Sequence, residues 1–144
     1  MILTQNGKQI IIKYLYKAMK DYKNYYLIKS TPEMVYRGLT NPLTIHLWSG
    51  EETIMEEKVG TEFSMFEGSI SGKILELEPG KKIVQQWYFG EQDKPSIVSI
   101  ILHPKGVNTS LELRHTNIPN ADYNDIVEGW NDVYMNRLIE FYDE

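Results

Sequence analysis

The side chains best suited to metal or acid–base chemistry are three histidines, His46, His103 and His115, in a chain without cysteine. A metal ion shared by them would need at least three ligands within about 2.0–2.2 Å. In the hairpin predicted below, His115 pairs with Ile97, which places it roughly 20 Å from His103 at about 3.3 Å per residue. The sequence therefore predicts no metal site and no cofactor.

Carboxylates and serines supply no second catalytic group at a suitable spacing. An acid–base pair needs two carboxylates with different environments in one pocket, whereas the glutamates of residues 51–57 are expected to be solvated. The serines of residues 64–71 have no histidine or aspartate partner in register. We therefore expect no enzyme activity; a cyclase-like enzyme, the third of three possibilities, could use at most His115 and Tyr134.

Three polar residues, Gln85, Ser99 and His115, are predicted on the inner face of a sheet. A buried amide or hydroxyl without a hydrogen-bond partner costs a few kcal/mol. Each therefore needs another protein group, an ordered water or the polar end of a bound ligand. For His115 the alternatives are a core histidine bonded to the backbone and a polar contact at the mouth of a cavity.

Composition narrows the class of protein. The net charge is −5, from 15 basic and 20 acidic residues, and the scattered Lys and Arg argue against a nucleic-acid surface. No apolar run approaches the roughly 18 residues of a membrane span. Residues 1–20 lack a signal-peptide pattern, so we expect a cytoplasmic protein. After this extension of uncertain structure, the chain of 144 residues is predicted to form one domain over residues 21–144.

The first part of that domain predicts one strand, Tyr22–Lys29, and two short helices. Ser30-Thr31-Pro32-Glu33 supplies a cap hydroxyl, a proline in the first turn and a glutamate three residues after Ser30, as in a capping box. Asn41-Pro42 ends the first helix and begins a second, which runs to Trp48. We expect Trp48 to form a lip over a cavity.

Two tight turns, Glu67-Gly68 and Pro79-Gly80, set the register of three strands. In that register Gly72 lies opposite both Phe63 and Trp87, and its missing side chain leaves space for the Trp87 ring. Further along the second hairpin, the predicted pairs are Ile74 with Gln85 and Glu76 with Ile83. One sheet face then carries Phe63, Met65, Ile70, Gly72, Ile74, Ile83, Gln85, Trp87 and Phe89.

A third hairpin, Ser96–His103 with Thr109–Thr116, turns around Pro104-Lys105-Gly106. Its first strand is apolar on both faces, so the alternation that would fix its orientation is missing. If His103 pairs with Thr109, the inner face carries Ile97, Ser99, Ile101, Leu111, Leu113 and His115.

A long amphipathic helix is predicted at Asp122–Tyr142. Gly129 lies inside it, where glycine costs about 1 kcal/mol relative to alanine; close packing of a neighbour, or plain tolerance, would account for it. The apolar stripe includes Ile126, Trp130, Val133 and Tyr134. The economical arrangement is α+β, a curved antiparallel sheet wrapped around this helix. The predicted cavity between them is lined by Trp48, Phe63, Met65, Gln85, Trp87, Phe89, Ser99, Ile101, Leu113, His115, Trp130 and Tyr134.

A series of short fragments also follows a familiar order: Thr31–Tyr36, Leu39–Pro42, Trp48, Gly60–Ser64, Gly68–Gly72, Leu75–Pro79, Lys82–Trp87, Leu113–Pro119 and Gly129-Trp130. As a set over about Tyr22–Phe141, they resemble the C-terminal domain of the activator of the heat-shock-protein-90 ATPase and its bacterial single-domain relatives. The resemblance implies a helix-grip fold of the START-like, birch-pollen-allergen-like superfamily, often with a cavity for a lipid-like or aromatic ligand. It also implies a stress-response role beside a chaperone, although the eukaryotic activators use a separate N-terminal domain for which this chain has no room.

We therefore expect non-catalytic binding of a small apolar or amphipathic molecule between the sheet and the C-terminal helix. Its polar end would be placed by Gln85, Ser99, His115 and Tyr134. The alternative is a chaperone accessory or protein-interaction module acting on heat-shock protein 90. Neither expectation involves nucleic acid or insertion into a membrane.

Overall fold

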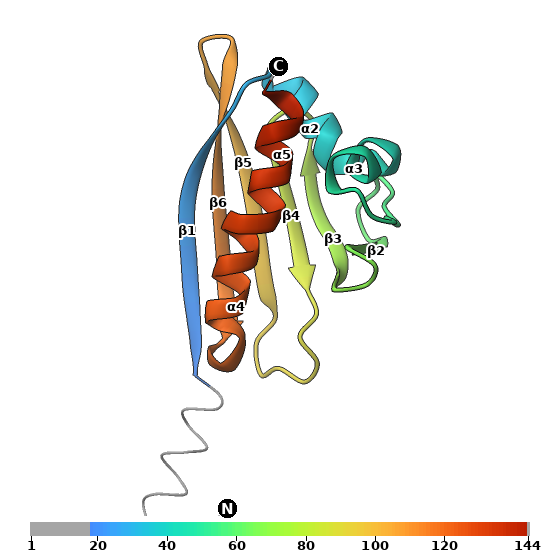
Figure 1. Ribbon diagram of the computed structural model, residues 1–144. Helices are drawn as coiled ribbons and strands as arrows, with labels where there is room; N and C mark the ends of the chain where they lie inside the picture. Colours follow the sequence, from blue (N-terminus) through green and yellow to red (C-terminus); the bar gives the residue numbers. More distant parts are fainter. Residues whose placement is uncertain (1–17, 144) are drawn as a thin grey trace, which may run out of the picture.

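A six-stranded antiparallel sheet curves around a long helical run in the computed structural model, which describes residues 18–143 (Figure 1). The sheet order is β1-β6-β5-β4-β3-β2. The strands are β1 (Met19–Ile28), β2 (Glu62–Met65), β3 (Ile70–Glu78), β4 (Lys82–Trp87), β5 (Ser96–Lys105) and β6 (Asn108–Pro119). Two short helices, α2 (Pro32–Thr40) and α3 (Pro42–Ser49), follow β1. This arrangement confirms the predicted α+β helix-grip fold.

The C-terminal helical run consists of η1 (Asn120–Asp122), α4 (Tyr123–Glu128), the π-helical segment η2 (Gly129–Met135) and α5 (Asn136–Tyr142). It confirms the helix predicted at Asp122–Tyr142. The run lies across the concave face of the sheet (Figure 1), where its buried residues are Trp130, Tyr134, Met135 and Leu138.

The predicted N-terminal extension overlaps the sheet by two residues, Met19 and Lys20, which belong to β1. Residues 1–17 of that extension lie outside the described part of the chain. Across residues 18–143, no helix combines the length and the apolar character that crossing a membrane would require.

Thr31 and Asn41 begin the two short helices. Each side-chain oxygen accepts the backbone N–H three residues further along the chain, at 3.3 Å for Thr31 and 3.0 Å for Asn41. The predicted capping box counted from Ser30 and is therefore wrong. With Thr31 as the cap, Glu33 is the second helical residue and cannot occupy the third position that the box requires.

Gly72 lies opposite Phe63 on β2 and Trp87 on β4, as predicted. The reason for the glycine differs from the prediction, however. A Cβ atom at this position would lie 1.8 Å from the carbonyl oxygen of Gln86 and 2.9 Å from Cε1 of Phe63. The close approach of the β4 backbone, and not the Trp87 ring, excludes a side chain here.

A bulge in β3 ends the agreement between the predicted and observed register of the β3–β4 hairpin. Pairing is as predicted as far as Ile74, but the register shifts between Ile74 and Glu76. Because the bulge adds one unpaired residue to β3, Glu76 lies opposite Val84 and not opposite Ile83.

The hairpin of β5 and β6 differs from its prediction by one residue. Its turn is Gly106-Val107, so that Thr109 pairs with Pro104 and not with His103. Because side chains alternate along a strand, a slip of one residue moves all of them to the other face.

This slip decides which side of β5 meets the helical run. Val98, Ile100 and Leu102 are buried on the inner face. Ser99 and Ile101, both predicted to line the cavity, are only half-buried and lie on the outer face. The prediction for these two residues is therefore wrong.

Candidate ligand-binding cleft

An apolar cleft of about 350 Å³ opens between the β2–β3 hairpin and the helical run. Its hairpin side is formed by Phe66, Ser69 and Ile70, with Trp87 from the end of β4. Its helical side is formed by Ile126, Gly129, Trp130, Val133 and Tyr134, and Glu51 and Asp125 each add a carboxylate.

Three aromatic rings, which we call the aromatic wall, form the inner side of this cleft. Trp87 stacks on Trp130 with ring centroids 4.8 Å apart and planes inclined by 21°, and Tyr134 lies 4.6 Å from Trp130. All three side chains are almost completely buried. They occupy the space between sheet and helix where the sequence predicted a cavity, so a ligand would have to lie against their outer side.

The π-helical segment η2 positions two residues of the aromatic wall. A π-helix forms hydrogen bonds from each residue to the fifth one along, and such segments are frequent at functional sites. Trp130 and Tyr134 both face the cleft from this segment. Gly129 leaves the surface beside them open, because a Cβ atom built there would meet no atom within 4 Å. Close packing, one of the two predicted explanations for Gly129, therefore does not account for it.

Behind the aromatic wall, His115 is completely buried. The Nε1–H of Trp130 donates to Nδ1 of His115 at 3.0 Å, and Nε2 of His115 lies 2.8 Å from Oγ of Ser96. Gln85 is similarly occupied, since its Oε1 accepts Nε1–H of Trp87 at 2.9 Å. Both polar residues therefore hold the wall from behind and do not line the cleft. His115 is therefore a core histidine, the first of the two predicted alternatives, but its partners are side chains and not the backbone.

Burial also shifts the protonation of two residues considered as a catalytic pair. It lowers the pKa of His115 to about 3 and raises the pKa of Tyr134. At neutral pH the imidazole is therefore uncharged and the phenol keeps its proton. A general acid or base works best with a pKa near the working pH, a condition that neither residue meets.

The predicted cavity residues divide into three groups. Those that line the cleft are Trp87, Trp130 and Tyr134. Those buried in the core behind it are Trp48, Phe63, Met65, Gln85, Leu113 and His115. Those elsewhere are Phe89, which is half-buried with its ring 6.0 Å from His115, and the outer-face residues Ser99 and Ile101.

Trp48 is a core residue, and the prediction that it forms a lip is wrong. Its side chain is 5% exposed. Its Nε1–H donates to the carbonyl oxygen of Gly38 at 2.7 Å, and its ring lies 5.1 Å from that of Tyr134. Trp48 therefore fastens α3 to α2 and to the helical run.

Phe66 is the most important cleft residue that sequence reasoning missed. It lies in the turn between β2 and β3 with a φ of 53°, outside any strand alternation. Its ring nevertheless packs 6.2 Å from Trp48 and 6.0 Å from Tyr134. Ile126 and Val133 could have been found, since both belong to the apolar stripe of the predicted helix.

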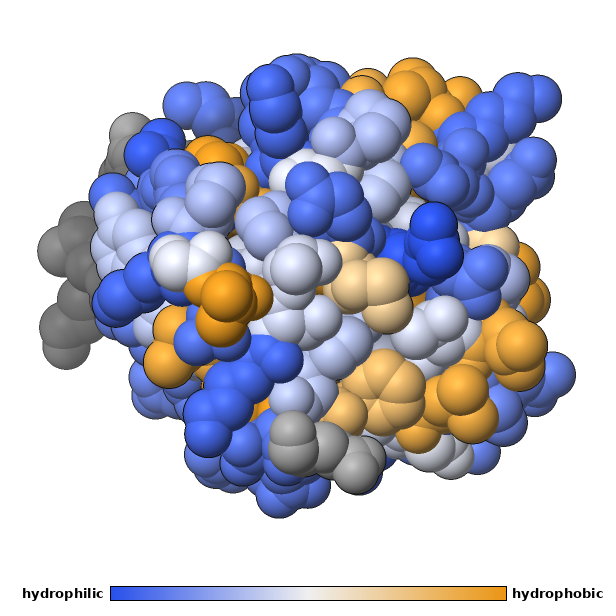
Figure 2. Space-filling model, turned by 90° about the horizontal axis from the view of Figure 1, so that it is seen from above, coloured by the Kyte–Doolittle hydropathy of each residue, from blue (hydrophilic) through white to orange (hydrophobic). Residues whose placement is uncertain are grey.

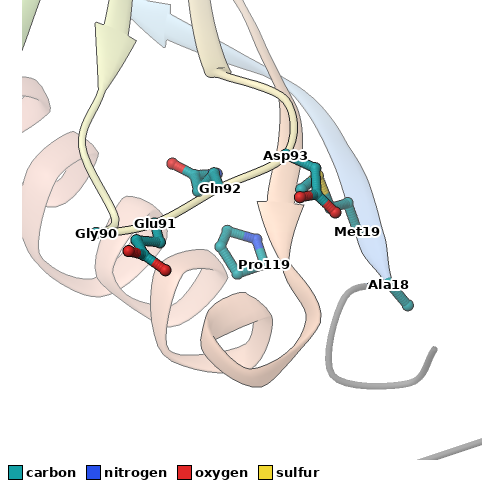
Figure 3. Close-up of a pocket in the computed structure, with 7 residues that line it drawn as sticks. All are labelled: Ala18, Met19, Gly90, Glu91, Gln92, Asp93 and Pro119. Carbon is teal, nitrogen blue, oxygen red and sulfur yellow. The ribbon is translucent and has the colours of Figure 1, made fainter. Parts of the chain in front are cut away.

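A second hollow, of about 580 Å³, lies where the described chain begins. Figure 3 shows its residues on the loop between β4 and β5, at the end of β6 and at the start of β1. It contains no aromatic ring and none of the predicted site residues; it is lined by Ala18, Met19, Gly90, Glu91, Gln92, Asp93 and Pro119. Within residues 18–143, no group of three His, Cys, Asp or Glu residues is arranged to hold a metal ion.

Apolar side chains also reach the surface on α3. Leu43 and Leu47 are 67% and 61% exposed. Figure 2, which views the molecule from above, shows apolar areas among the hydrophilic surface at this end.

Comparison with known proteins gives a consistent result. The profile of the family described as "Activator of Hsp90 ATPase homolog 1-like protein" matches residues 29–142. The chain is 30% identical over 111 residues to the "Activator of 90 kDa heat shock protein ATPase homolog" of Dictyostelium discoideum. It is 27% identical over 111 residues to the "Activator of 90 kDa heat shock protein ATPase homolog 1" of Homo sapiens. These matches cover 75% and 76% of the chain but 29% and 33% of the relatives, so the chain spans about a third of their length.

Solved structures agree with the sequence matches. An HSP90 activator from Plasmodium falciparum superimposes with a TM-score of 0.76 at 26% identity, over 84% of this chain and 94% of that one. A protein from Mesorhizobium loti has a TM-score of 0.74 at 24% identity, over 86% of this chain and 97% of its own, and shows the same fold.

Proposed function

Because the chain belongs to the family of Activator of Hsp90 ATPase homolog 1-like proteins, we propose that it is a non-catalytic module that binds a small apolar or amphipathic molecule in the cleft. The observation that carries this proposal is the aromatic wall of Trp87, Trp130 and Tyr134 beside an open volume of about 350 Å³. Ligand pockets commonly have volumes of about 300–1,000 Å³ and mostly apolar linings.

Binding would be driven by burial of apolar surface, at about 25 cal/mol per Å² before the costs of association. The stacked rings of Trp130 and Trp87 are fixed by hydrogen bonds to His115 and Gln85. The entropic cost of ordering these side chains on ligand binding should therefore be small. The non-catalytic part of the proposal is supported by the neutral state of His115 and the protonated state of Tyr134 at neutral pH.

Gly129 and Asn136 allow a matched test of the cleft. Phenylalanine at position 129 would project into the open space beside the aromatic wall, whereas the exposed Asn136 on α5 does not line the cleft. An uncharged ligand, 4-phenyl-1-butanol, is titrated while the indole N–H signals of the three tryptophans are followed by nitrogen-15 NMR. We expect the signals of Trp87 and Trp130 to shift in the wild type and in Asn136→Phe, but not in Gly129→Phe.

Two results would contradict the proposal. The first is no shift in the wild type at millimolar 4-phenyl-1-butanol. The second is an unchanged shift in a folded Gly129→Phe variant. Native mass spectrometry of freshly purified protein would complement the titration, since a retained small molecule should be lost from Gly129→Phe and kept by Asn136→Phe.

A second candidate, a protein-interaction module acting on heat-shock protein 90, is favoured by the exposed Leu43 and Leu47 of α3. ATP turnover by the chaperone of the same cell is measured with the wild type and with a Leu43→Ser, Leu47→Ser double variant. An increase in turnover that the double variant weakens would support this candidate. An unchanged rate together with no detectable complex would remove it. Either function would operate in the cytoplasm, as the cysteine-free sequence favours.

A further inference from the structure

The cleft carries negative charge on its lining and no basic side chain. Glu51 and Asp125 are its charged lining residues. The carboxylate of Glu51 is already neutralised, since its Oε2 lies 3.0 Å from Nη1 of Arg137. Asp125 takes part in no ion pair within residues 18–143. Within residues 18–143, the Asp125 carboxylate therefore borders an apolar surface with no side-chain counterion, in the first turn of α4, where the helix dipole favours a negative charge.

The two carboxylates stand at different ends of the cleft. Asp125 precedes Arg137, the partner of Glu51, by about three turns of the helical run. Asp125 therefore lies at the end where Ile126 and Gly129 border the opening, with the aromatic wall between it and Glu51.

At the Glu51 end of the cleft, a cationic side chain already lies beside a carboxylate and an aromatic ring. The guanidinium of Arg137 lies 5.6 Å from the ring centroid of Phe66 while it pairs with Glu51. A cation is thus held between an aromatic face and a carboxylate, both of which attract it. The Asp125 end also combines a carboxylate with an aromatic ring of the lining, that of Trp130, but no basic side chain of residues 18–143 is paired with Asp125.

We infer that the ligand of this cleft is an amphipathic cation, with an ammonium-type head group at Asp125 and an apolar body across the aromatic wall. The inference rests on the proposed function and adds the chemical class of the ligand. An anionic amphipath, such as a fatty carboxylate, would bring its charge to a lining that offers it no basic partner and would be repelled by Asp125.

Three compounds with one apolar body and different head groups test this inference. They are 4-phenylbutylamine, charged positively at neutral pH, the neutral 4-phenyl-1-butanol and the anionic 4-phenylbutyrate. Dissociation constants are measured from the indole N–H shifts at low salt. We expect the amine to bind about twofold to fivefold more tightly than the alcohol, as for a partly exposed ion pair, and the carboxylate to bind more weakly than both. The advantage of the amine should shrink as salt is added.

Asp125→Asn and Asp132→Asn form the matched pair of variants. Both remove one negative charge from the helical run, but Asp132 is exposed and does not line the cleft. Asp125→Asn should abolish the advantage of the amine over the alcohol, whereas Asp132→Asn should preserve it. The inference fails if the amine binds no better than the alcohol, or if its advantage survives Asp125→Asn. If none of the three compounds binds, the proposed function fails with it, so the two failures are distinguishable.

Discussion

The indole Nε1–H of Trp130 on the helical run donates a hydrogen bond of 3.0 Å to Nδ1 of His115 on β6. Because an indole N–H can only donate, Nδ1 must be the accepting nitrogen and the imidazole proton must lie on Nε2. Nε2 then donates to Oγ of Ser96, whose own proton is directed to the carbonyl oxygen of Thr116 at 3.2 Å. This chain of hydrogen bonds, in which each group donates to the next, joins the helical run to β5 and β6. A second proton on His115, at Nδ1, would break the hydrogen bond from Trp130.

Replacing His115 by glutamine should make the protein less sensitive to acid. The folded-state pKa of His115, about 3, lies below its ordinary value of 6.5. The unfolded chain therefore takes up the proton first, and stability that is fully present above pH 6.5 is lost as the pH falls toward 3. Between about pH 7.5 and pH 5, this single group should cost the wild type about 2 kcal/mol of unfolding free energy.

Urea unfolding of the wild type and His115→Gln at both pH values measures this difference, because the other titrating groups are common to the two proteins. Equal losses in the two proteins would show that His115 is not held neutral by its surroundings.

Replacing Trp130 by phenylalanine should destabilise the protein, because Nδ1 of His115 loses its hydrogen-bond donor. The variant keeps an aromatic ring but removes the only donor to Nδ1 of His115 described above, and an unsatisfied buried acceptor costs about 1–3 kcal/mol. The same substitution should cost less in a His115→Leu background, where no acceptor remains. Equal costs in the two backgrounds, measured by denaturant unfolding, would argue that only lost packing matters.

Alanine substitutions at Gly72 and Gly129 should have opposite effects on stability. At Gly72 the new Cβ would lie 1.8 Å from the Gln86 carbonyl oxygen, so two strands must move apart, at a cost of about 1–3 kcal/mol or more. At Gly129 the new Cβ meets nothing within 4 Å, and alanine favours helix by up to about 1 kcal/mol. Thermal unfolding of both variants against the wild type gives the signs directly, and a shared sign would contradict the contacts described for one of them.

Replacing Glu112 by glutamine should remove a source of acid sensitivity on the outer face of the sheet. Hydrogen bonding to His103, at 2.8 Å, and the nearby Arg114 lower the pKa of the Glu112 carboxyl below its ordinary value of 4.5. Its contribution to stability is therefore present above pH 4.5 and is lost as the pH falls through the lower folded-state pKa. Glu112→Gln should be less stable than the wild type at neutral pH, and the difference should shrink in acid. Glu62→Gln, at an exposed position, is the control and should show a smaller effect.

Turns with strong residue preferences made part of the sheet predictable. Glu67-Gly68 and Pro79-Gly80 restrict the backbone so narrowly that the alternation of the flanking strands could be counted outward from them. The bulge beyond Ile74 has no such turn from which to count. Its sign in the sequence is weaker: Ile74 and Leu75 are adjacent apolar residues where strict alternation would place a polar one, and Leu75-Glu76-Leu77-Glu78 then continues in the opposite phase.

The orientation of β5 could not be predicted from its hydrophobic pattern. Val98, Ile100 and Leu102 alternate with Ile97 and Ile101, so either face of the strand could have met the core. The hydrophobic pattern therefore could not distinguish the two registers, and the length of the turn decided the outcome. Ser99 was assigned to the wrong face for this reason.

The cleft could be predicted where it rests on helical periodicity or, for Trp87, on the strand register counted from Pro79-Gly80. Trp130 and Tyr134 follow from the apolar stripe of the helix. Phe66 does not, because its turn has a left-handed backbone that no strand pattern describes. The π-helical widening at Gly129 is also invisible to local periodicity, since it changes the hydrogen bonding and not the residue types.

The two margins of the sheet are protected from other protein chains by different means. At β2, Ile54 of the preceding loop forms a bridge with Ser64 and covers the four-residue strand. At β1, no further strand pairs among residues 18–143, and two exposed lysines lie along the margin: Lys20, and Lys23, whose Nζ is 3.8 Å from Oε2 of Glu112. Charged side chains discourage intermolecular strand pairing, but their repulsion weakens with rising ionic strength. Resistance to aggregation should therefore be independent of salt at the β2 margin, and it should weaken with added salt at the β1 margin.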